Sequence, residues 1–186
     1  AEDTPVGTNR LLVSTDLTDD WEILDVNLES LIAIPITKDT DDNNKDPSWS
    51  PNGSQVVTSS NRLEDYELFV LDLDGSVVSQ LTDNHVSDEQ PAWSPDGEFI
   101  AFKSDRTGDV ELFVMRADGT DIRQLTDSPG TDLEPVWSPD GKKLAFTSNR
   151  DGRLEVFLLE VSSQDISKTG ITGIPADWRY DDEFAG

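Results

Sequence analysis

The stretch Trp93-Ser94-Pro95-Asp96-Gly97 occurs three times in this sequence with almost no change. The other two copies are Trp49-Ser50-Pro51-Asn52-Gly53 and Trp137-Ser138-Pro139-Asp140-Gly141, so successive copies begin 44 residues apart. A proline lies two residues before each tryptophan, and an apolar run, a Ser-Asn/Asp-Arg sequence and a Glu-apolar-Phe-apolar sequence follow each copy. The repeat therefore covers a whole structural unit.

Four short strands fit into each repeat. Strand a carries the tryptophan and ends at Ser-Pro-Asp/Asn-Gly, where proline presets φ and glycine accepts a positive φ. Strand b is the apolar run, strand c is the Glu-apolar-Phe-apolar run, and strand d ends at Leu-Thr. A period of about 40–45 residues with four strands per unit is typical of a β-propeller blade. No helical period is sustained, so we expect an all-β fold.

We predict a single β-propeller domain over residues 1–186, with about four blades of four antiparallel strands. The expected blades are residues 4–37 plus 174–179 for blade 1, 46–82 for blade 2, 90–126 for blade 3 and 134–172 for blade 4.

Blade 1 lacks its tryptophan strand, and Pro175-Ala176-Asp177-Trp178 is the expected replacement. This C-terminal strand would join the N-terminal blade, close the ring and cover the exposed sheet edges. The residues from Trp178 onward also resemble the start of another repeat. A larger ring, or a half ring that pairs with itself, therefore remains open as an alternative.

The composition is strongly acidic, with 39 acidic and 14 basic side chains and a formal net charge of −25. Such a field repels phosphate groups and anionic lipids, so we expect no nucleic-acid partner. It suits a soluble surface, a cationic partner or a salty habitat. No apolar stretch approaches ~18 residues, so we expect no membrane insertion. The absence of cysteine excludes disulfides, thiol catalysis and thiolate metal sites.

The repeats resemble those of the TolB-type β-propeller family, which read Pro-x-Trp-Ser-Pro-Asp-Gly, Ile-Ala-Phe-x-Ser-Asp-Arg and Arg-Gln-Leu-Thr. The resemblance is strong over residues 46–172, and the unit 89–126 is nearly a consensus example. It implies a binding ring with partners at the channel mouth and a periplasmic or extracellular location. Compared with the TolB pattern, we expect about four repeats instead of six and no N-terminal α/β domain.

Acidic and amide residues precede the Pro-x-Trp sequences. Since the innermost strands of a propeller line its axis, we expect these residues at one channel mouth. The predicted mouth residues are Asp46, Gln90, Glu134 and Asp177 around the axis, with Asp42, Asp88 and Asp132 near the rim and His85 in a loop beside them. Converging carboxylates repel one another, and a bound cation with oxygen ligands would relieve this. Asp46, Glu134 and Asp177 are therefore candidate ligands for Ca²⁺ or another hard cation, unless the ring is wide enough for water to screen them.

The other repeated side chains are expected to be structural. A large aromatic side chain at the same place in every blade predicts packing between sheets. The repeated arginines, Arg62, Arg106 and Arg150, lie beside repeated carboxylates, Glu67, Glu111 and Glu155, and this predicts an internal ion pair or hydrogen-bond clamp.

We expect a non-catalytic binding or interaction propeller that offers its channel-mouth loops to a protein, peptide or glycan, as a monomer or a homodimer. Gly-x-Ser-x-Gly, His-Glu-x-x-His and a phosphate-binding Gly-rich loop are absent from the sequence. Two alternatives stay open, since related blades occur in polysaccharide lyases and in propellers that gate peptidases. One is a metal-assisted lyase or hydrolase at the axis, and the other is the separated regulatory propeller of a peptidase.

Overall fold

The computed structural model describes residues 9–16, 20–38 and 42–173. These residues form fifteen strands in four antiparallel sheets and no helix. No helix long and apolar enough to cross a membrane occurs in the described residues. The prediction of an all-β propeller with four blades is confirmed.

Each sheet follows the order of the chain, with hydrogen-bonded neighbours adjacent in sequence. The first sheet contains β1 (Arg10–Thr15), β2 (Glu22–Asn27) and β3 (Ile32–Pro35). The second contains β4 (Asn44–Trp49), β5 (Gln55–Leu63), β6 (Asp65–Asp72) and β7 (Val77–Gln80). The third contains β8 (Asp88–Trp93), β9 (Phe99–Ser104), β10 (Glu111–Arg116) and β11 (Arg123–Gln124). The fourth contains β12 (Asp132–Trp137), β13 (Lys143–Ser148), β14 (Glu155–Glu160) and β15 (Ile166–Thr172).

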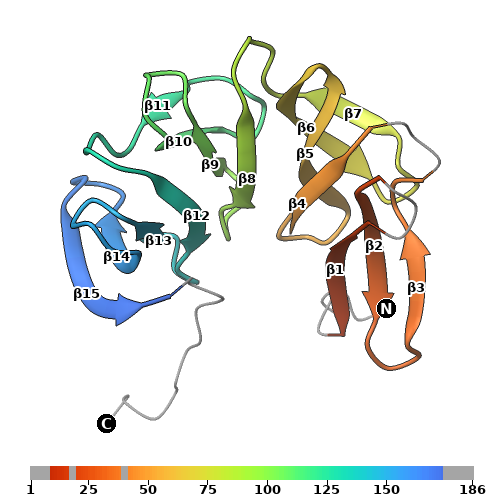
Figure 1. Cartoon of the computed structure of the whole chain (residues 1–186). Helices are drawn as coiled ribbons and strands as arrows, with labels where there is room; N and C mark the ends of the chain where they lie inside the picture. Colours follow the sequence, from red (N-terminus) through yellow and green to blue (C-terminus); the bar gives the residue numbers. More distant parts are fainter. Residues whose placement is uncertain (1–8, 17–19, 39–41, 174–186) are drawn as a thin grey trace, which may run out of the picture.

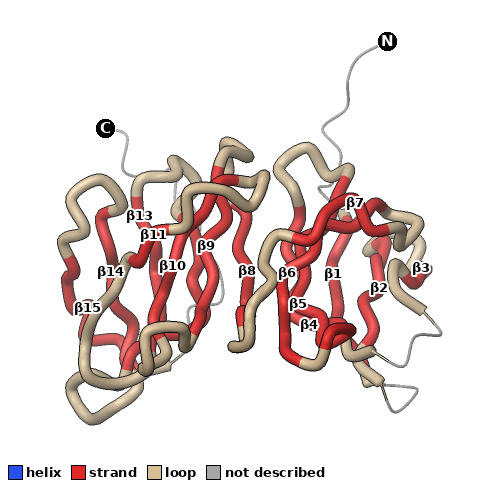
Figure 2. Tube along the Cα trace, turned by 90° about the horizontal axis from the view of Figure 1, so that it is seen from above, coloured by secondary structure: helices blue, strands red, loops and turns tan. Residues whose placement is uncertain are grey.

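The four sheets stand side by side in an arc, with β4, β8 and β12 on its inner side (Figure 1). Seen from above, the strands run between two ends at which the loops lie (Figure 2). The described strands of the first sheet make no contact with those of the fourth, so the described arc is open on that side. The segment 174–179, predicted to close the ring, lies outside the described residues.

The first repeat, whose sequence lacks the tryptophan strand, forms a blade whose described strands resemble those of the other blades. The Oγ1 atom of Thr37 accepts the backbone N–H of Ile23 at 2.8 Å. Thr82 and Thr126 make the same bond to Leu68 and Leu112 in the next two blades, each at 2.9 Å. Among the described residues its sheet has the order β1-β2-β3, without a strand at the place where the other sheets have the tryptophan strand.

The hydrophobic core consists of layers between adjacent blades. Three clusters of buried residues occupy the junctions between the first and second, second and third, and third and fourth sheets. In each of the last two junctions a pair of phenylalanines packs with ring centres 5.8 Å apart. The repeated phenylalanines therefore pack between sheets as predicted, and Trp137 does so too.

The hairpin between β6 and β7 gives a stability prediction. Gly75 has φ of +86°, and a Cβ atom there would lie 2.2 Å from the carbonyl oxygen of Ile36 in the preceding blade. Gly152 has φ of +83° with no atom within 4 Å of such a Cβ. Both Gly→Ala changes should cost about 1–2 kcal/mol because of the positive φ, and Gly75→Ala should cost clearly more. Urea unfolding of the two variants measures this, and equal losses would contradict the close junction.

Candidate functional site

Each complete innermost strand contains a β-bulge at the residue before its proline. The pairing with the neighbouring strand shifts between Lys45 and Ser48, and at the matching places in β8 and β12. The residues before the prolines, Asp46, Gln90 and Glu134, have φ of 53°, 54° and 55°. A positive φ is uncommon for such residues and persists only where the surrounding structure holds it. The three predicted axial residues therefore occupy one repeated, strained position.

These bulge residues connect neighbouring blades. The backbone N–H of Gln90 donates to the Oγ atom of Ser59 in the preceding blade at 3.3 Å, and the Gln90 Oε1 atom accepts the backbone N–H of Glu134 at 2.9 Å. Burial raises the pKa of Asp46, and the charge of Lys45 opposes this effect. Ser59 and Thr147 donate to the carboxylates of Asp46 and Glu134 at 3.4 and 3.3 Å. Each bulge side chain is therefore already engaged by the protein.

An ion cluster lies beside this chain of bonds. The Nζ atoms of Lys45 and Lys103 lie 2.5 and 3.3 Å from the two carboxylate oxygens of Glu89. Burial opposes the ionisation of Glu89, but the two lysines outweigh it and lower its pKa. The Lys45 Nζ atom also lies 3.8 Å from the ring centre of Tyr66. The cluster joins the second and third blades, and it was not predicted from the sequence.

Asp88 and Asp132, predicted near the rim of the mouth, are buried at the starts of β8 and β12. Both residues are 0% exposed and bind Arg106 and Arg150 at 2.7 Å. Each begins an innermost strand and pairs across it with a serine, Ser104 or Ser148, so it lies under the loops and not on them. The predicted arginine clamp exists, but its acidic partner is the aspartate of the innermost strand.

The same clamp in the second blade has a neutral partner. Arg62 donates to the side-chain oxygen of Asn44 at 3.1 Å. In this blade Asn44 stands where the next two blades have Asp88 and Asp132. The arginine therefore has an uncharged partner in the second blade and a charged partner in the third and fourth blades.

The remaining predicted mouth residues are placed as follows. Asp42 is half-buried, and His85 is exposed in the loop between β7 and β8. Asp177 lies outside the described residues. The described part of the chain brings no three His, Asp or Glu residues together as metal ligands. The cation site at Asp46, Glu134 and Asp177 stays a prediction.

Two buried glutamates, Glu67 and Glu111, form different hydrogen bonds with the loops that lead to the next blade. The Glu67 carboxylate accepts the backbone N–H of Asn84 at 2.6 Å, and the Asn84 side-chain amide reaches both Glu67 and Asp88 at 3.4 and 2.7 Å. One junction later, Glu111 accepts the backbone N–H of Ser128 at 2.8 Å. The Ser128 Oγ atom and the Asp132 Oδ1 atom are buried without a hydrogen-bond partner in the described residues. Burial, followed by the adjacent Asp132 carboxylate, raises the pKa of Glu111.

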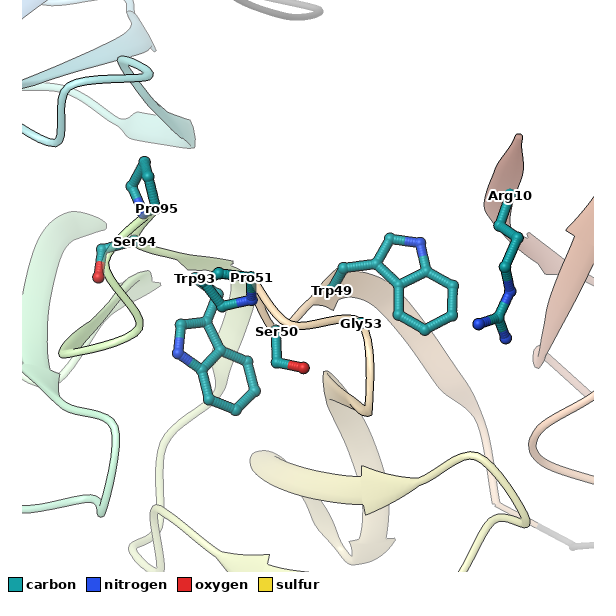
Figure 3. A pocket seen from close by; sticks show the side chains of 8 residues that line it. All are labelled: Arg10, Trp49, Ser50, Pro51, Gly53, Trp93, Ser94 and Pro95. Carbon is teal, nitrogen blue, oxygen red and sulfur yellow. The ribbon is translucent and has the colours of Figure 1, made fainter. Parts of the chain in front are cut away.

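A cavity of about 320 Å³ lies at the opposite end of the innermost strands from these clamps. Its lining residues are Arg10, Trp49, Ser50, Pro51, Gly53, Trp93, Ser94 and Pro95 (Figure 3). The Arg10 guanidinium lies 4.6 Å from the ring centre of Trp49 and forms an ion pair with Asp25. Trp49 and Trp93 are half-buried, so the prediction that the tryptophans pack between sheets describes them only in part.

Comparisons with known proteins agree with this architecture. A family model described as TolB beta propeller domain matches residues 20–119 and 106–182. A structure assigned as TolB from Agrobacterium tumefaciens has a TM-score of 0.75 at 24% identity, over 84% of this chain and 59% of that one. TolB from Acinetobacter baumannii has a TM-score of 0.78 at 22% identity, over 89% of this chain and 42% of that one.

Dipeptidyl peptidase 4 from Porphyromonas gingivalis has a TM-score of 0.63 at 14% identity, over 86% of this chain and 24% of that one. At these identities the structures share the fold alone, and the chain spans less than two thirds of each. No curated protein matches the sequence. Because the family model covers more than half of the chain, this protein belongs to the TolB β-propeller domain family.

Proposed function

We propose that the protein is a non-catalytic binding propeller that presents the loops at one end of its blades to a segment of another protein. The mouth loops, residues 83–87 and 127–131, join the outermost strand of one blade to the innermost strand of the next. Asp46, Gln90 and Glu134 lie on the innermost strands beside these loops. We further propose a periplasmic or extracellular location, in line with the TolB proteins that share the fold.

This proposal rests on one difference: the mouth loops vary in sequence, whereas the ion pairs beneath them repeat. The loops differ in sequence, and Asp83, His85 and Asp127 are exposed on them. Directly below, the ion pairs Asp88–Arg106 and Asp132–Arg150, whose aspartates are buried, repeat without change in the third and fourth blades. Variable loops on a rigid scaffold are the common place for binding residues.

The charge of this end favours a basic partner. The loops after β9 and β13 lie beside the mouth loops, because the ends of these strands pair with the starts of β8 and β12. They add the exposed residues Asp105 and Asp109 to Asp83 and Asp127. Asp151 is also exposed there, but it pairs with Lys168 at 2.8 Å. Opposite charges across an interface speed association and select the partner. We therefore propose a lysine- or arginine-rich protein segment, in preference to a neutral peptide or a glycan.

A lysine–alanine peptide tests this proposal by calorimetric titration at ~20 and ~300 mM NaCl, since salt screens exposed charges. We expect saturable binding that weakens with salt and weakens again in Asp83→Asn/Asp127→Asn. The control Glu98→Gln/Asp121→Asn removes the same charge from exposed residues at the opposite end and should leave the affinity unchanged. Equal weakening by both pairs would mean diffuse attraction to an acidic protein and would overturn the proposal, as would the absence of saturable binding.

A further inference from the structure

Two successive blade junctions differ at one side chain that lies between buried carboxylates. In the junction of the second and third blades, the Asn84 Nδ2 atom lies 3.4 Å from the Glu67 carboxylate and 2.7 Å from the Asp88 carboxylate. The amide nitrogen therefore occupies the point between these two carboxylates. One repeat later, the corresponding residues are Glu111, Ser128 and Asp132. The serine side chain is shorter than that of asparagine and ends in a single hydroxyl.

Buried oxygen atoms without a partner lie at this second point. Asp132 is 0% exposed, and its Oδ2 atom accepts from Arg150 at 2.7 Å. The Asp132 Oδ1 atom and the Ser128 Oγ atom are buried and have no hydrogen-bond partner in the described residues. The Glu111 carboxylate, which is 2% exposed, lies beside Asp132. Because a buried polar atom without a partner costs free energy, these oxygens favour a bound ligand.

The charges at this point do not balance. Glu111 and Asp132 each carry a negative charge when ionised, and Arg150 supplies one positive charge. Burial and then the Asp132 carboxylate raise the pKa of Glu111. A ligand with a single positive charge would neutralise the group. The fourth blade provides such a charge itself, because the ammonium group of Lys168 pairs with Glu155, the counterpart of Glu111.

We infer that Glu111, Asp132 and the Ser128 hydroxyl bind a small monovalent cation such as Na⁺ at the junction of the third and fourth blades. Hard cations take oxygen ligands, but Ca²⁺ needs about 6–8 of them. The site has two carboxylates, and no group of three acidic residues suited to a metal occurs in the described part of the chain. A monovalent ion therefore fits better than a divalent one.

The bound ion would hold the loop of residues 127–131 against the third blade. The backbone N–H of Ser128 already donates to Glu111 at 2.8 Å, and Asp132 begins β12 directly after this loop. The ion would lie beneath the mouth loops and not on their exposed surface. The inference goes beyond the proposed function and does not rest on it.

Thermal unfolding of the full chain at neutral pH tests the site in ~0.2 M NaCl and in ~0.2 M choline chloride, which screen exposed charges equally. Choline is too large to enter a buried point between side chains. A ligand that binds only the folded protein stabilises it, so we expect the melting temperature to be at least about 2 °C higher in NaCl. This increment should saturate when NaCl replaces choline chloride stepwise at constant total salt.

Three variants locate the ion. Ser128→Asn brings the amide of the preceding junction to the site, so its melting temperature should be the same in both salts. Asn84→Ser removes that amide and should enlarge the sodium increment by creating a second site. Ser162→Asn makes the same exchange as the first variant at an exposed serine and should keep the increment of the parent protein.

Equal melting temperatures of the parent protein in the two salts would overturn the inference. A sodium increment that Ser128→Asn leaves in place would also overturn it, because the ion would then bind elsewhere on this acidic chain. An increment in Asn84→Ser no larger than that of the parent would contradict the correspondence between the two junctions, on which the inference rests. None of these results would change lysine–alanine binding at the mouth loops, so the site and the proposed function fail separately.

Discussion

Replacing Arg106 by alanine should lower the free energy of unfolding by about 3–5 kcal/mol, the usual effect of leaving a buried charge without its partner. Asp88 is 0% exposed, and both of its carboxylate oxygens accept from the Arg106 Nη2 atom, at 2.8 and 2.7 Å. Arg106 also stacks on Phe102 and Phe113, with its guanidinium carbon 5.3 and 4.9 Å from the ring centres. Urea unfolding at neutral pH measures the loss.

Arg62→Ala is the internal control for this result. Arg62 has the same position in the second blade, stacks on Phe69 at 4.5 Å, and hydrogen-bonds the neutral Asn44. Its removal deletes a similar side chain without leaving a buried charge, so the loss should be smaller by about 1–3 kcal/mol. Asp88→Asn combined with Arg106→Ala should recover much of the difference. Equal losses for Arg62→Ala and Arg106→Ala would show that packing, not charge, determines the stability of the clamp.

This clamp also shows why part of the site could be predicted from the sequence. The number and order of the strands followed from the spacing of the Trp-Ser-Pro-Asp-Gly copies, because turn residues and apolar runs act locally. The burial of Asp88 could not be predicted from this spacing. A carboxylate at the start of a strand is exposed or buried depending on which side chain of another strand contacts it. The sequence signal for this burial was Arg106, which repeats in blades 3 and 4 as Asp88 does. The sequence pattern predicts Glu111 as its partner, and the structure shows Asp88.

The cavity at Trp49 was missed for a related reason. The repetition of the tryptophan correctly indicated packing between sheets for Trp137, which has a complete preceding blade. In the described residues the sheet before Trp49 has no innermost strand, and Trp49 borders a cavity; Trp93 borders the same cavity although a four-stranded sheet precedes it. A repeat pattern describes a position within a unit, and burial depends on the neighbouring unit as well.

The second large expected effect is a dependence of the free energy of unfolding on pH. It arises at the junction of the third and fourth blades. Burial and the Asp132 carboxylate raise the pKa of Glu111 above its ordinary value. The folded protein therefore binds a proton at Glu111 more tightly than the unfolded chain does. The contribution to stability is full below the ordinary pKa of a glutamate and is lost as the pH rises through the raised pKa. Glu111 should thus make the protein less stable at neutral pH than at mildly acidic pH.

Ser128→Asn should reduce this loss of stability at neutral pH. In the preceding junction Asn84 stands at the corresponding position, and its side-chain amide donates to both Glu67 and Asp88. An asparagine at position 128 would supply the same two donors to Glu111 and Asp132, of which the Oδ1 atom of Asp132 now has no partner in the described residues. We expect about 1–2 kcal/mol of added stability at neutral pH, the size of hydrogen bonds to charged groups, and little near pH 4.5.

The reciprocal change, Asn84→Ser, separates ionisation from packing. It removes the amide between Glu67 and Asp88, so the pKa of Glu67, which burial already raises, should rise further. Stability should then fall more steeply with pH than in the parent protein. Urea unfolding from pH 4.5 to 8 compares the three proteins. A constant difference between Ser128→Asn and the parent across this range would contradict the argument, because an effect that does not depend on pH does not arise from the ionisation of Glu111.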